Sequence, residues 1–513
     1  MTGVQTCALP ICDNYHSLSV LNYSHSGKID VIYIDPPYNT GNKDFIYNDR
    51  YVDDEDTFKH SKWLSFMSKR LNLAKDLLAI DGVLIISIDD NEHANLKILC
   101  DEIFGEENFI APIVVNSNSS KNNSKYISVA HEYALIYAKN KTEIKSGWKV
   151  KKNNADEFRK RAKQLVSRGL EDNELHKELL ELVKYPRFYD FDHYTYADKK
   201  DVFRTDNPGG VKSGNTKTIL KHPITGKDCP QPQGGWRYKE DELHRMANEG
   251  LLYFGKDEST IPAPKRYLGD YMYQIPKSAV FFDSQSSTKQ LKKLGLKFDF
   301  PKATDLIRHF LSLSQKENCT VLDFMAGSGT TGHAVLELNK EDGGNRKFIL
   351  CTNNENKIAE EVTYPRIKSV IDGYEKVDGI PANVRYFKTS LVSKKQTDDQ
   401  TRVELVARST DMICLREDTF EPVLETKHYK VFSGPSHYSA IVFEPDAIDE
   451  LKEKLSKLET DEAVHIYVFS MSNDTYENDF ADLEREHELR PIPESILEVY
   501  RRIFKDQNVS IGA

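Results

Sequence analysis

Residues 29–38 read IDVIYIDPPY, a run of β-branched and aromatic residues that stops at an acid, two prolines and a tyrosine. A short apolar run closed by prolines predicts a buried β-strand. Asp35, Pro36, Pro37 and Tyr38 then follow at the carboxyl end of that strand, which is where open α/β sheets bind ligands. Because a proline turn after a strand is common, these four residues alone leave open whether the turn is catalytic or structural.

The composition describes a large, water-compatible chain. It has 513 residues, of which 39% are hydrophobic and 29% charged, and this length suggests about three domains. No stretch reaches the roughly 18 uncharged apolar residues that a membrane span needs, so we expect no membrane contact. The seven cysteines include no C-x-x-C pair, which argues against a zinc knuckle or a disulfide framework. Reduced thiols in a cytoplasmic protein are the favoured interpretation.

The first twelve residues, MTGVQTCALPIC, look foreign to the rest. They resemble the translation of a sequencing-adapter oligonucleotide, and natural-looking sequence begins near Asp13. The alternative is a short signal peptide, but the segment has no basic start and too short an apolar core. We therefore exclude residues 1–12 from the fold and expect the native amino terminus to be missing.

The charge is unevenly distributed. Residues 116–300 contain 34 Lys and Arg against 24 Asp and Glu, a net charge of +10, whereas the whole chain carries −10. For a polyanion-binding protein the local field matters more than the total. The basic middle therefore allows nucleic-acid contact, although a solvated insertion fits the same numbers.

Strand and helix patterns alternate over residues 28–138 and again from about residue 318, which predicts an α/β fold with a parallel sheet. The residues between these stretches do not show this alternation, and an acidic α/β pattern follows after about residue 395. We expect five segments: an artefact at 1–12, the catalytic half of a core at 13–139, an insertion at 140–295, the cofactor-binding half at 296–394, and a C-terminal domain at 395–513.

The expected insertion mixes basic and aromatic residues, notably in segments 185–189, 234–238 and 265–268. Such mixtures suit phosphate contacts combined with base or sugar stacking. The alternative is that the aromatics form the core of a small inserted domain, and for most of them we favour this second interpretation.

A second ligand turn is predicted at residues 324–330, FMAGSGT, directly after a strand. Gly327 and Gly329 let the backbone approach a ligand closely, and helix amides point at it. The turn lacks the Gly-Lys-Ser/Thr of a triphosphate loop and the spacing of a dinucleotide fingerprint. Glu355, 26 residues beyond Gly329 at the next strand end, could accept both hydroxyls of a ribose or be a surface acid.

Taken together, these motifs resemble a known family. Asp-Pro-Pro-Tyr preceding Phe-x-Gly-x-Gly, with a basic insertion between them, is similar to the beta subclass of adenine-N6 DNA methyltransferases that use S-adenosyl-L-methionine. Four segments more closely resemble the modification subunits of type III restriction-modification systems: 34–41, 131–133, 300–302 and 361–367. The resemblance covers roughly residues 13–390, and the tail more loosely.

The resemblance implies a Rossmann-like methyltransferase sheet with circularly permuted motif order and an inserted target-recognition domain. It implies that Asp35 and the Pro36 carbonyl hold the amine of a flipped-out adenine, that Pro37 stiffens the turn, and that Tyr38 stacks on the base. It implies no metal. The residues it assigns to S-adenosyl-L-methionine are Asp323, Phe324, Ala326, Gly327, Ser328, Gly329, Thr330, Glu355 and, at the amino-acid end, Lys302.

The resemblance also implies partners and leaves rivals open. Double-stranded DNA is the expected substrate, a helicase or nuclease restriction subunit the expected partner, and a cytoplasmic homodimer the expected form. Because an acid-rich surface is a poor DNA ligand, we expect residues 395–513 to form a subunit or dimer contact. One rival is cytosine-N4 transfer, which usually has serine in place of Asp35. The other is an inactive DNA-binding module, if the missing amino terminus was essential.

Overall fold

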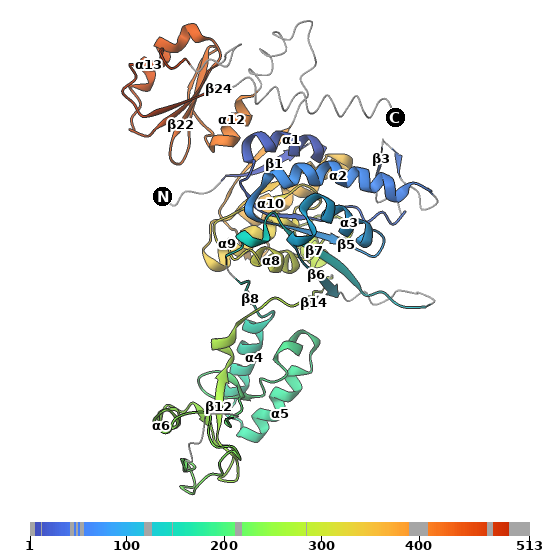
Figure 1. The fold of residues 1–513 in the computed structure, drawn as a ribbon, viewed down its shortest axis with the longest axis vertical. Helices are drawn as coiled ribbons and strands as arrows, with labels where there is room; N and C mark the ends of the chain where they lie inside the picture. The colour runs from blue at the N-terminus through green and yellow to red at the C-terminus, as the bar shows by residue number, and fades with distance from the viewer. Residues whose placement is uncertain are drawn as a thin grey trace. The chain divides into compact units, whose positions relative to one another are not determined.

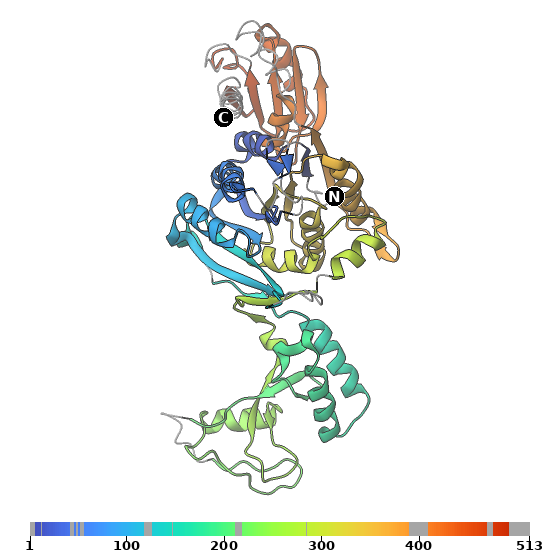
Figure 2. The same ribbon diagram turned by 90° about the vertical axis from the view of Figure 1, so that its right-hand side faces the viewer.

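The structure, a computed structural model, divides into two compact units, Met1–Gly147 with Lys277–Ala513, and Trp148–Pro276 (Figures 1 and 2). It describes residues 6–11, 13–41, 46–47, 50–51, 56–116, 126–145, 147–210, 218–283, 285–388, 409–468 and 476–491.

A nine-stranded sheet organises the first unit. Its strands, in spatial order, are β14 (Ala279–Phe281), β6 (Phe109–Asn116), β7 (His131–Ala138), β5 (Leu78–Ile88), β2 (Ile29–Ile34), β15 (Thr320–Asp323), β16 (Lys347–Leu350), β1 (Thr6–Ile11) and β19 (Asn383–Lys388). Every neighbouring pair is parallel except the two pairs that β7 makes with β5 and β6. The sheet is therefore parallel with one reversed strand.

Strand β2 is apolar on both faces because helices cover both. Ile32 and Ile34 point into the cluster that includes Trp63 of helix α2 (Lys59–Leu77). Tyr33, on the other face, stacks on Phe310 of helix α8 (Thr304–Ser312) at 5.9 Å. Two faces buried by crossover helices explain why the strand reads as a continuous apolar run instead of an alternating one.

The helices that pack on this nine-stranded sheet form two layers (Figure 1). Those on the Trp63 face are α1 (Asn14–His25), α2 (Lys59–Leu77) and α3 (His93–Phe104). Those associated with the Tyr33 face are α8 (Thr304–Ser312), α9 (Thr330–Asp342) and α10 (Tyr364–Asp372), while α7 (Gln285–Lys293) precedes them in the chain. Short hairpins are formed by β3 (Ile46–Tyr47) with β4 (Arg50–Tyr51) and by β17 (Gly373–Tyr374) with β18 (Val377–Asp378).

The amino-terminal segment takes part in the sheet. Strand β1 lies between β16 and β19, with Ala8 opposite Ile349 and residues 6–11 opposite 383–388. Excluding residues 1–12 from the fold was therefore wrong for this strand, because an apolar run beside a parallel edge adds to it readily whatever its origin. The adapter origin of the segment stays a prediction.

The second unit, Trp148–Pro276, has its own small cores. Its elements are β8 (Val150–Lys151), α4 (Ala155–Ser167), α5 (Asp172–Val183), β9 (Tyr196–Ala197), β10 (Val202–Thr205), α6 (Glu240–Asn248), β11 (Leu252–Tyr253), β12 (Ala263–Tyr267) and β13 (Tyr273–Gln274). Helices α4 and α5 pack on each other (Figure 2) around Phe158 and Leu179, while Trp236 centres a second cluster with α6.

The C-terminal part of the first unit is a separate five-stranded sheet in the order β20 (Glu421–Glu425), β21 (Tyr429–Ser433), β22 (Tyr438–Val442), β23 (Val464–Val468) and β24 (His487–Pro491). Its core residues alternate between two clusters: Ile466 packs with helix α13 (Ile448–Leu455), and Tyr467 packs with α12 (Thr410–Glu417). The sheet is therefore covered on both faces.

The expected α/β fold is confirmed. The compact second unit, 148–276, is narrower than the expected insertion at 140–295, because β14 joins the main sheet beside β6. The expected C-terminal domain at 395–513 lies partly outside the described residues, which omit 389–408, 469–475 and 492–513. Across the described helices, none combines the length and the apolar character that crossing a bilayer requires.

Candidate active site

The two ligand turns predicted from sequence lie side by side. Strands β2 and β15 are parallel neighbours, with Val31 opposite Val321 and Ile32 opposite Leu322. Asp35 and Asp323 therefore follow at the same, carboxyl edge of the sheet. Because the chain continues from β2 toward β5 on one side and from β15 toward β16 on the other, this edge is a topological switch point, the usual ligand site of such sheets.

Contacts with neighbouring helices and loops hold the Asp35 turn in place. Pro36 is buried, and the indole nitrogen of Trp63 donates to the Pro37 carbonyl at 2.7 Å. Asn39 adopts a left-handed φ of 58° and donates through its amide nitrogen to Glu92 at 2.5 Å. Two prolines and these contacts leave the turn little freedom, so the Asp35 carboxyl is held in place relative to the strand.

Four polar side chains meet at this turn: Asp35, Tyr38, Glu132 and Lys302. The Lys302 ammonium donates to the Tyr38 hydroxyl and to Glu132 Oε2, both at 2.6 Å, and lies 3.4 Å from Asp35 Oδ1. The Tyr38 hydroxyl lies 3.0 Å from Asp35 Oδ1 and 3.0 Å from Glu132 Oε2, so its single proton serves one carboxylate at a time. Among the described residues, every hydrogen bond to the Asp35 carboxylate uses Oδ1.

The charges of this cluster perturb one another. Burial raises the pKa of the Asp35 carboxyl above its usual range, and the Lys302 ammonium opposes that rise. Burial lowers the pKa of Lys302, but the Asp35 and Glu132 carboxylates outweigh it, and the net pKa lies above its ordinary value. Burial and both carboxylates raise the pKa of Tyr38 well above its usual value. Lys302 is therefore charged and Tyr38 protonated at neutral pH.

Glu132 was missed from sequence as a site residue, although the segment 131–133 carried part of the family resemblance. It reaches the site because β7 runs against its neighbours: its first residues lie where β5 ends, with Tyr133 opposite Ile88. A residue at a strand's amino end thus joins residues at carboxyl ends. Lys302 was expected at the amino-acid end of the cofactor, and the structure places it against Asp35.

Asp323 organises the second turn. Its Oδ1 accepts from the Met325 backbone amide at 2.9 Å and its Oδ2 from the Thr331 hydroxyl at 2.5 Å. Burial raises the pKa of this carboxyl to about 7, and the two hydrogen bonds only partly offset it. Whether Asp323 also contacts a cofactor stays a prediction.

Glycine is required at two places in this turn. Gly327 and Gly329 have φ values of 48° and 78°, which strain any residue with a Cβ. A Cβ at Gly329 would also lie 3.1 Å from the Thr363 side chain. Ala326 lies beside them, its backbone amide bonded to the Cys351 carbonyl at 3.1 Å. Because these two positions lack a Cβ, the start of helix α9 forms a cradle in which a ligand can approach the backbone closely.

Three residues predicted to bind the cofactor are held by the protein instead. Phe324 lies in the hydrophobic core. The side chains of Ser328 and Thr330 accept hydrogen bonds from one nitrogen of buried Arg366, at 3.0 and 2.7 Å. Burial lowers the pKa of Arg366 to about 10, yet it stays charged at neutral pH. Arg366 was also missed from sequence. Because it binds the side chains of Ser328 and Thr330 and because Phe324 is in the core, these three residues are left with mainly backbone atoms for contact with a ligand.

Glu355 is exposed on a short turn beyond β16, and Asn353 donates to it at 3.4 Å. Since β16 is parallel to β15, Glu355 lies at the same edge of the sheet as the glycine turn. Its carboxylate is accessible to a hydroxyl-bearing ligand.

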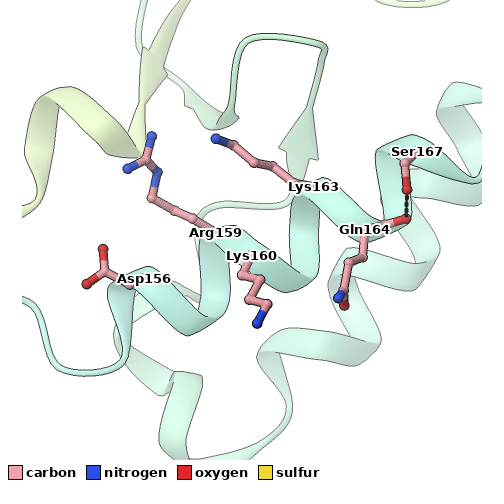
Figure 3. Close-up of a pocket in the computed structure, with 6 residues that line it drawn as sticks. All are labelled: Asp156, Arg159, Lys160, Lys163, Gln164 and Ser167. Carbon is pink, nitrogen blue, oxygen red and sulfur yellow. Dashed lines mark hydrogen bonds between the residues drawn. The ribbon is translucent and has the colours of Figure 1, made fainter. Parts of the chain in front are cut away.

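The second unit carries a basic groove of about 460 Å³ along one side of helix α4 (Figure 3). Arg159 is bonded to Asp201, with Nη2 at 2.8 Å from Oδ2, whereas Lys160 and Lys163 are exposed. The residues that line the groove are Asp156, Arg159, Lys160, Lys163, Gln164 and Ser167. Their charge suits an anionic ligand.

Another buried carboxylate, Glu417, lies in the C-terminal part. His437 and His465 approach its Oε2 at 3.2 and 2.6 Å, and these three side chains have the spacing of metal ligands. Its other oxygen accepts from Arg490 at 2.7 Å and from the Tyr467 hydroxyl. Both oxygens of this carboxylate therefore take part in a hydrogen-bond network.

Comparison with known proteins gives consistent matches. The sequence model of the DNA methylase family of N6/N4 methyltransferases matches residues 29–363. The chain is 33% identical over 370 residues to the EcoP15I Mod subunit, a type III restriction-modification enzyme of Escherichia coli, covering 66% of this chain and 57% of that protein. It is 32% identical over 410 residues to the StyLTI Mod subunit of Salmonella typhimurium, covering 73% and 56%.

A third relative is the type II methyltransferase M.KpnI of Klebsiella pneumoniae, 32% identical over 379 residues, which cover 72% of this chain and 84% of that protein. The chain thus spans little more than half the length of the Mod subunits that it matches.

Proposed function

Since the chain belongs to the DNA methylase family, we propose that it transfers a methyl group from S-adenosyl-L-methionine to the exocyclic N6 of adenine in double-stranded DNA. It would do so as the modification subunit of a restriction-modification system, in the cytoplasm. The observation that carries the proposal is the Asp35 turn, rigid and adjacent to the glycine turn at the carboxyl edge of one sheet.

The chain's own residues would activate the amine. The lone pair of adenine N6 is delocalised into the ring, and two hydrogen-bond acceptors favour the tetrahedral geometry that releases it. Asp35, whose Oδ2 carries none of the described hydrogen bonds, would accept one N–H, and the Pro36 carbonyl the other. The new bond would join N6 to the methyl carbon, the donor would leave as a neutral thioether, and the extra amine proton would pass to solvent. Alignment of the two reactants supplies most of the rate.

The target base has to leave the duplex to reach this edge. The ring of Tyr38 lies beside the acceptor, held by its hydroxyl contacts with Glu132 and Lys302. We propose that this ring stacks on the flipped adenine, while Pro37 keeps the turn stiff.

The residues present fit the methyl donor. The cradle at Gly327 and Gly329 admits a ligand against the backbone, and exposed Glu355 can accept ribose hydroxyls. Asp323 and Ala326 complete the turn. When bound there, S-adenosyl-L-methionine supplies an electrophilic methyl group on its sulfonium. Lys302 stays a proposed cofactor contact because it lies beside Asp35, 3.4 Å from Oδ1.

The groove on α4 would contact the DNA backbone. Lys160 and Lys163 are exposed on one side of a helix within the basic insertion, and lysine contacts to phosphates supply affinity without sequence preference. We propose that the unit formed by Trp148–Pro276 is the target-recognition domain.

Partners are proposed by analogy with the Mod relatives: a restriction subunit and a second copy of this chain, with the C-terminal sheet as contact. Cytosine-N4 transfer remains the second candidate reaction, because the matching family model covers both N6 and N4 methyltransferases. An inactive DNA-binding module remains the third.

The test is a transfer assay with purified protein, duplex DNA and donor labelled on its methyl group, followed by nucleoside analysis. We expect label in N6-methyladenine. Label in N4-methylcytosine would establish the second reaction, and tight DNA binding without labelled product at saturating donor would establish the third.

A further inference from the structure

In the reaction described so far Glu132 only helps to hold Tyr38, yet its charge belongs to the cluster at Asp35. Its side chain is 24% exposed, that of Lys302 15%, and Oε2 of Glu132 accepts from the Lys302 ammonium at 2.6 Å. Buried charges are retained when they are paired. Lys302 and Asp35 alone would already form a pair, so the second carboxylate needs a separate explanation.

The net charge of the cluster explains why a second carboxylate is present. Asp35 and Glu132 carry one negative charge each and Lys302 one positive, which leaves −1 in a partly desolvated site. Without Glu132 the Lys302 ammonium would neutralise Asp35. During methyl transfer the attacking amine acquires positive charge, and a net negative site stabilises that charge more than a neutral one does.

The geometry assigns a second role to Glu132. Lys302 donates to Glu132, to the Tyr38 hydroxyl and toward Asp35 Oδ1, which accounts for its three protons. Lys302 and Tyr38 contact Oδ1 of Asp35, and among the described residues none hydrogen-bonds Oδ2. Glu132 therefore fixes the direction in which Lys302 approaches Asp35.

We propose that Glu132 is a positioning residue for methyl transfer: through Lys302 and Tyr38 it orients the Asp35 carboxylate and keeps the site's net charge at −1. The inference rests on the proposed function and extends it to a residue on the one reversed strand of the sheet.

Charge-altering variants test this directly. Glu132→Gln preserves the shape and an acceptor oxygen but makes the cluster neutral, and Lys302→Met makes it −2. The double variant Glu132→Gln/Lys302→Met returns it to −1. We expect kcat to fall at least about tenfold in Glu132→Gln and to recover partly in the double variant, with donor binding by calorimetry unchanged in Glu132→Gln.

The pH profile adds a readout that a purely structural role would not move. The groups facing Asp35 are Lys302, Glu132, Tyr38, Tyr33 and Asp323. Removing the Glu132 charge lowers the pKa of Asp35, so the acidic limb of kcat/KM moves to lower pH in Glu132→Gln. It moves to higher pH in Lys302→Met, where the stabilising cation is lost.

The matched control is Glu143→Gln, a carboxylate on the exposed turn that follows the same strand, which should match wild type. A double variant worse than both single variants, or equal pH profiles, overturns the inference while wild-type transfer still supports the proposed function. Wild-type protein without transfer overturns the function itself. If Glu132→Gln does not fold alone, the comparison of Lys302→Met with the double variant decides: the acidic limb lies at lower pH in the double variant if the Glu132 charge acts on Asp35, and equal limbs overturn the inference.

Discussion

Asp35 and Glu417 are carboxylates that each lie beside a tyrosine hydroxyl and a cationic side chain, but their pKa values shift in opposite directions. Burial raises the pKa of Asp35, with one cation shared between it and a second carboxylate. Burial also acts on Glu417, but donors from Tyr467, His465 and Arg490 outweigh it, and its pKa falls to about 2. Asp35 keeps an oxygen without a described partner, whereas both oxygens of Glu417 are engaged.

The difference separates a reactive carboxylate from a structural one. A carboxylate with a free oxygen can bind a new donor without breaking existing bonds. One with every oxygen engaged stabilises the fold and offers nothing to a substrate. Removing each side chain should therefore affect different measurements.

The largest effect is expected at Asp35. Asp35→Ala should lower kcat for methyl transfer by about 10³-fold, because one of two acceptors of the amine is lost, while donor binding persists. Asp30→Asn is the control on the same strand: Asp30 lies at the opposite end of β2 and pairs with Lys316 at 2.6 Å. Equal turnover in wild type and Asp35→Ala would refute the acceptor role.

At Glu417 the expected loss is in stability. Glu417→Ala should lower the free energy of unfolding of the C-terminal part by about 3 to 4 kcal/mol, since it strands the buried donors that face it. Turnover per folded molecule should persist. Denaturant titration checks the first statement, and a stable variant would contradict it.

The same carboxylate predicts acid sensitivity. The folded pKa of Glu417, about 2, lies below the ordinary value of 4.5, so its ionised form stabilises the fold above pH 4.5, and this contribution is lost as pH falls toward 2. The loss amounts to at most about 3 kcal/mol. In Glu417→Gln the slope of unfolding free energy against pH in this window should flatten. An unchanged slope would show that other groups set it.

The smallest effect concerns the groove of α4. Lys160→Ala/Lys163→Ala should weaken DNA binding about tenfold and reduce the salt dependence by about 1.8 in the log–log slope, for two phosphate contacts. Base preference should not change. Lys177→Ala on acidic α5, also exposed, is the control, and equal slopes in both variants would exclude the groove from the DNA interface.

Part of this site could be read from sequence because its information is local. An apolar run ending in Asp35 and a glycine pair after a strand each mark a strand end, and parallel strands bring such ends to one edge. The α/β fold was predictable for the same reason. The family order of the two motifs then suggested the chemistry.

The remainder depends on contacts between distant parts of the chain. Glu132 and Lys302 are 170 residues apart, and nothing in the periodicity around residue 131 says that β7 reverses. The buried partnership of Arg366 with Ser328 and Thr330 is equally invisible, since Ser and Thr in a glycine turn look like ligand contacts. Strand β1 was not predicted because its sequence looked foreign, although adding a strand to a sheet requires only backbone hydrogen bonds and apolar side chains.

The most direct test of the Asp35 acceptor is methylation mapping of host DNA in cells expressing either the wild-type gene or Asp35→Ala. We predict N6-methyladenine at a defined sequence with the wild-type gene and none with the variant. Equal N6-methyladenine in both, or N4-methylcytosine in its place, would contradict an adenine amine held at Asp35.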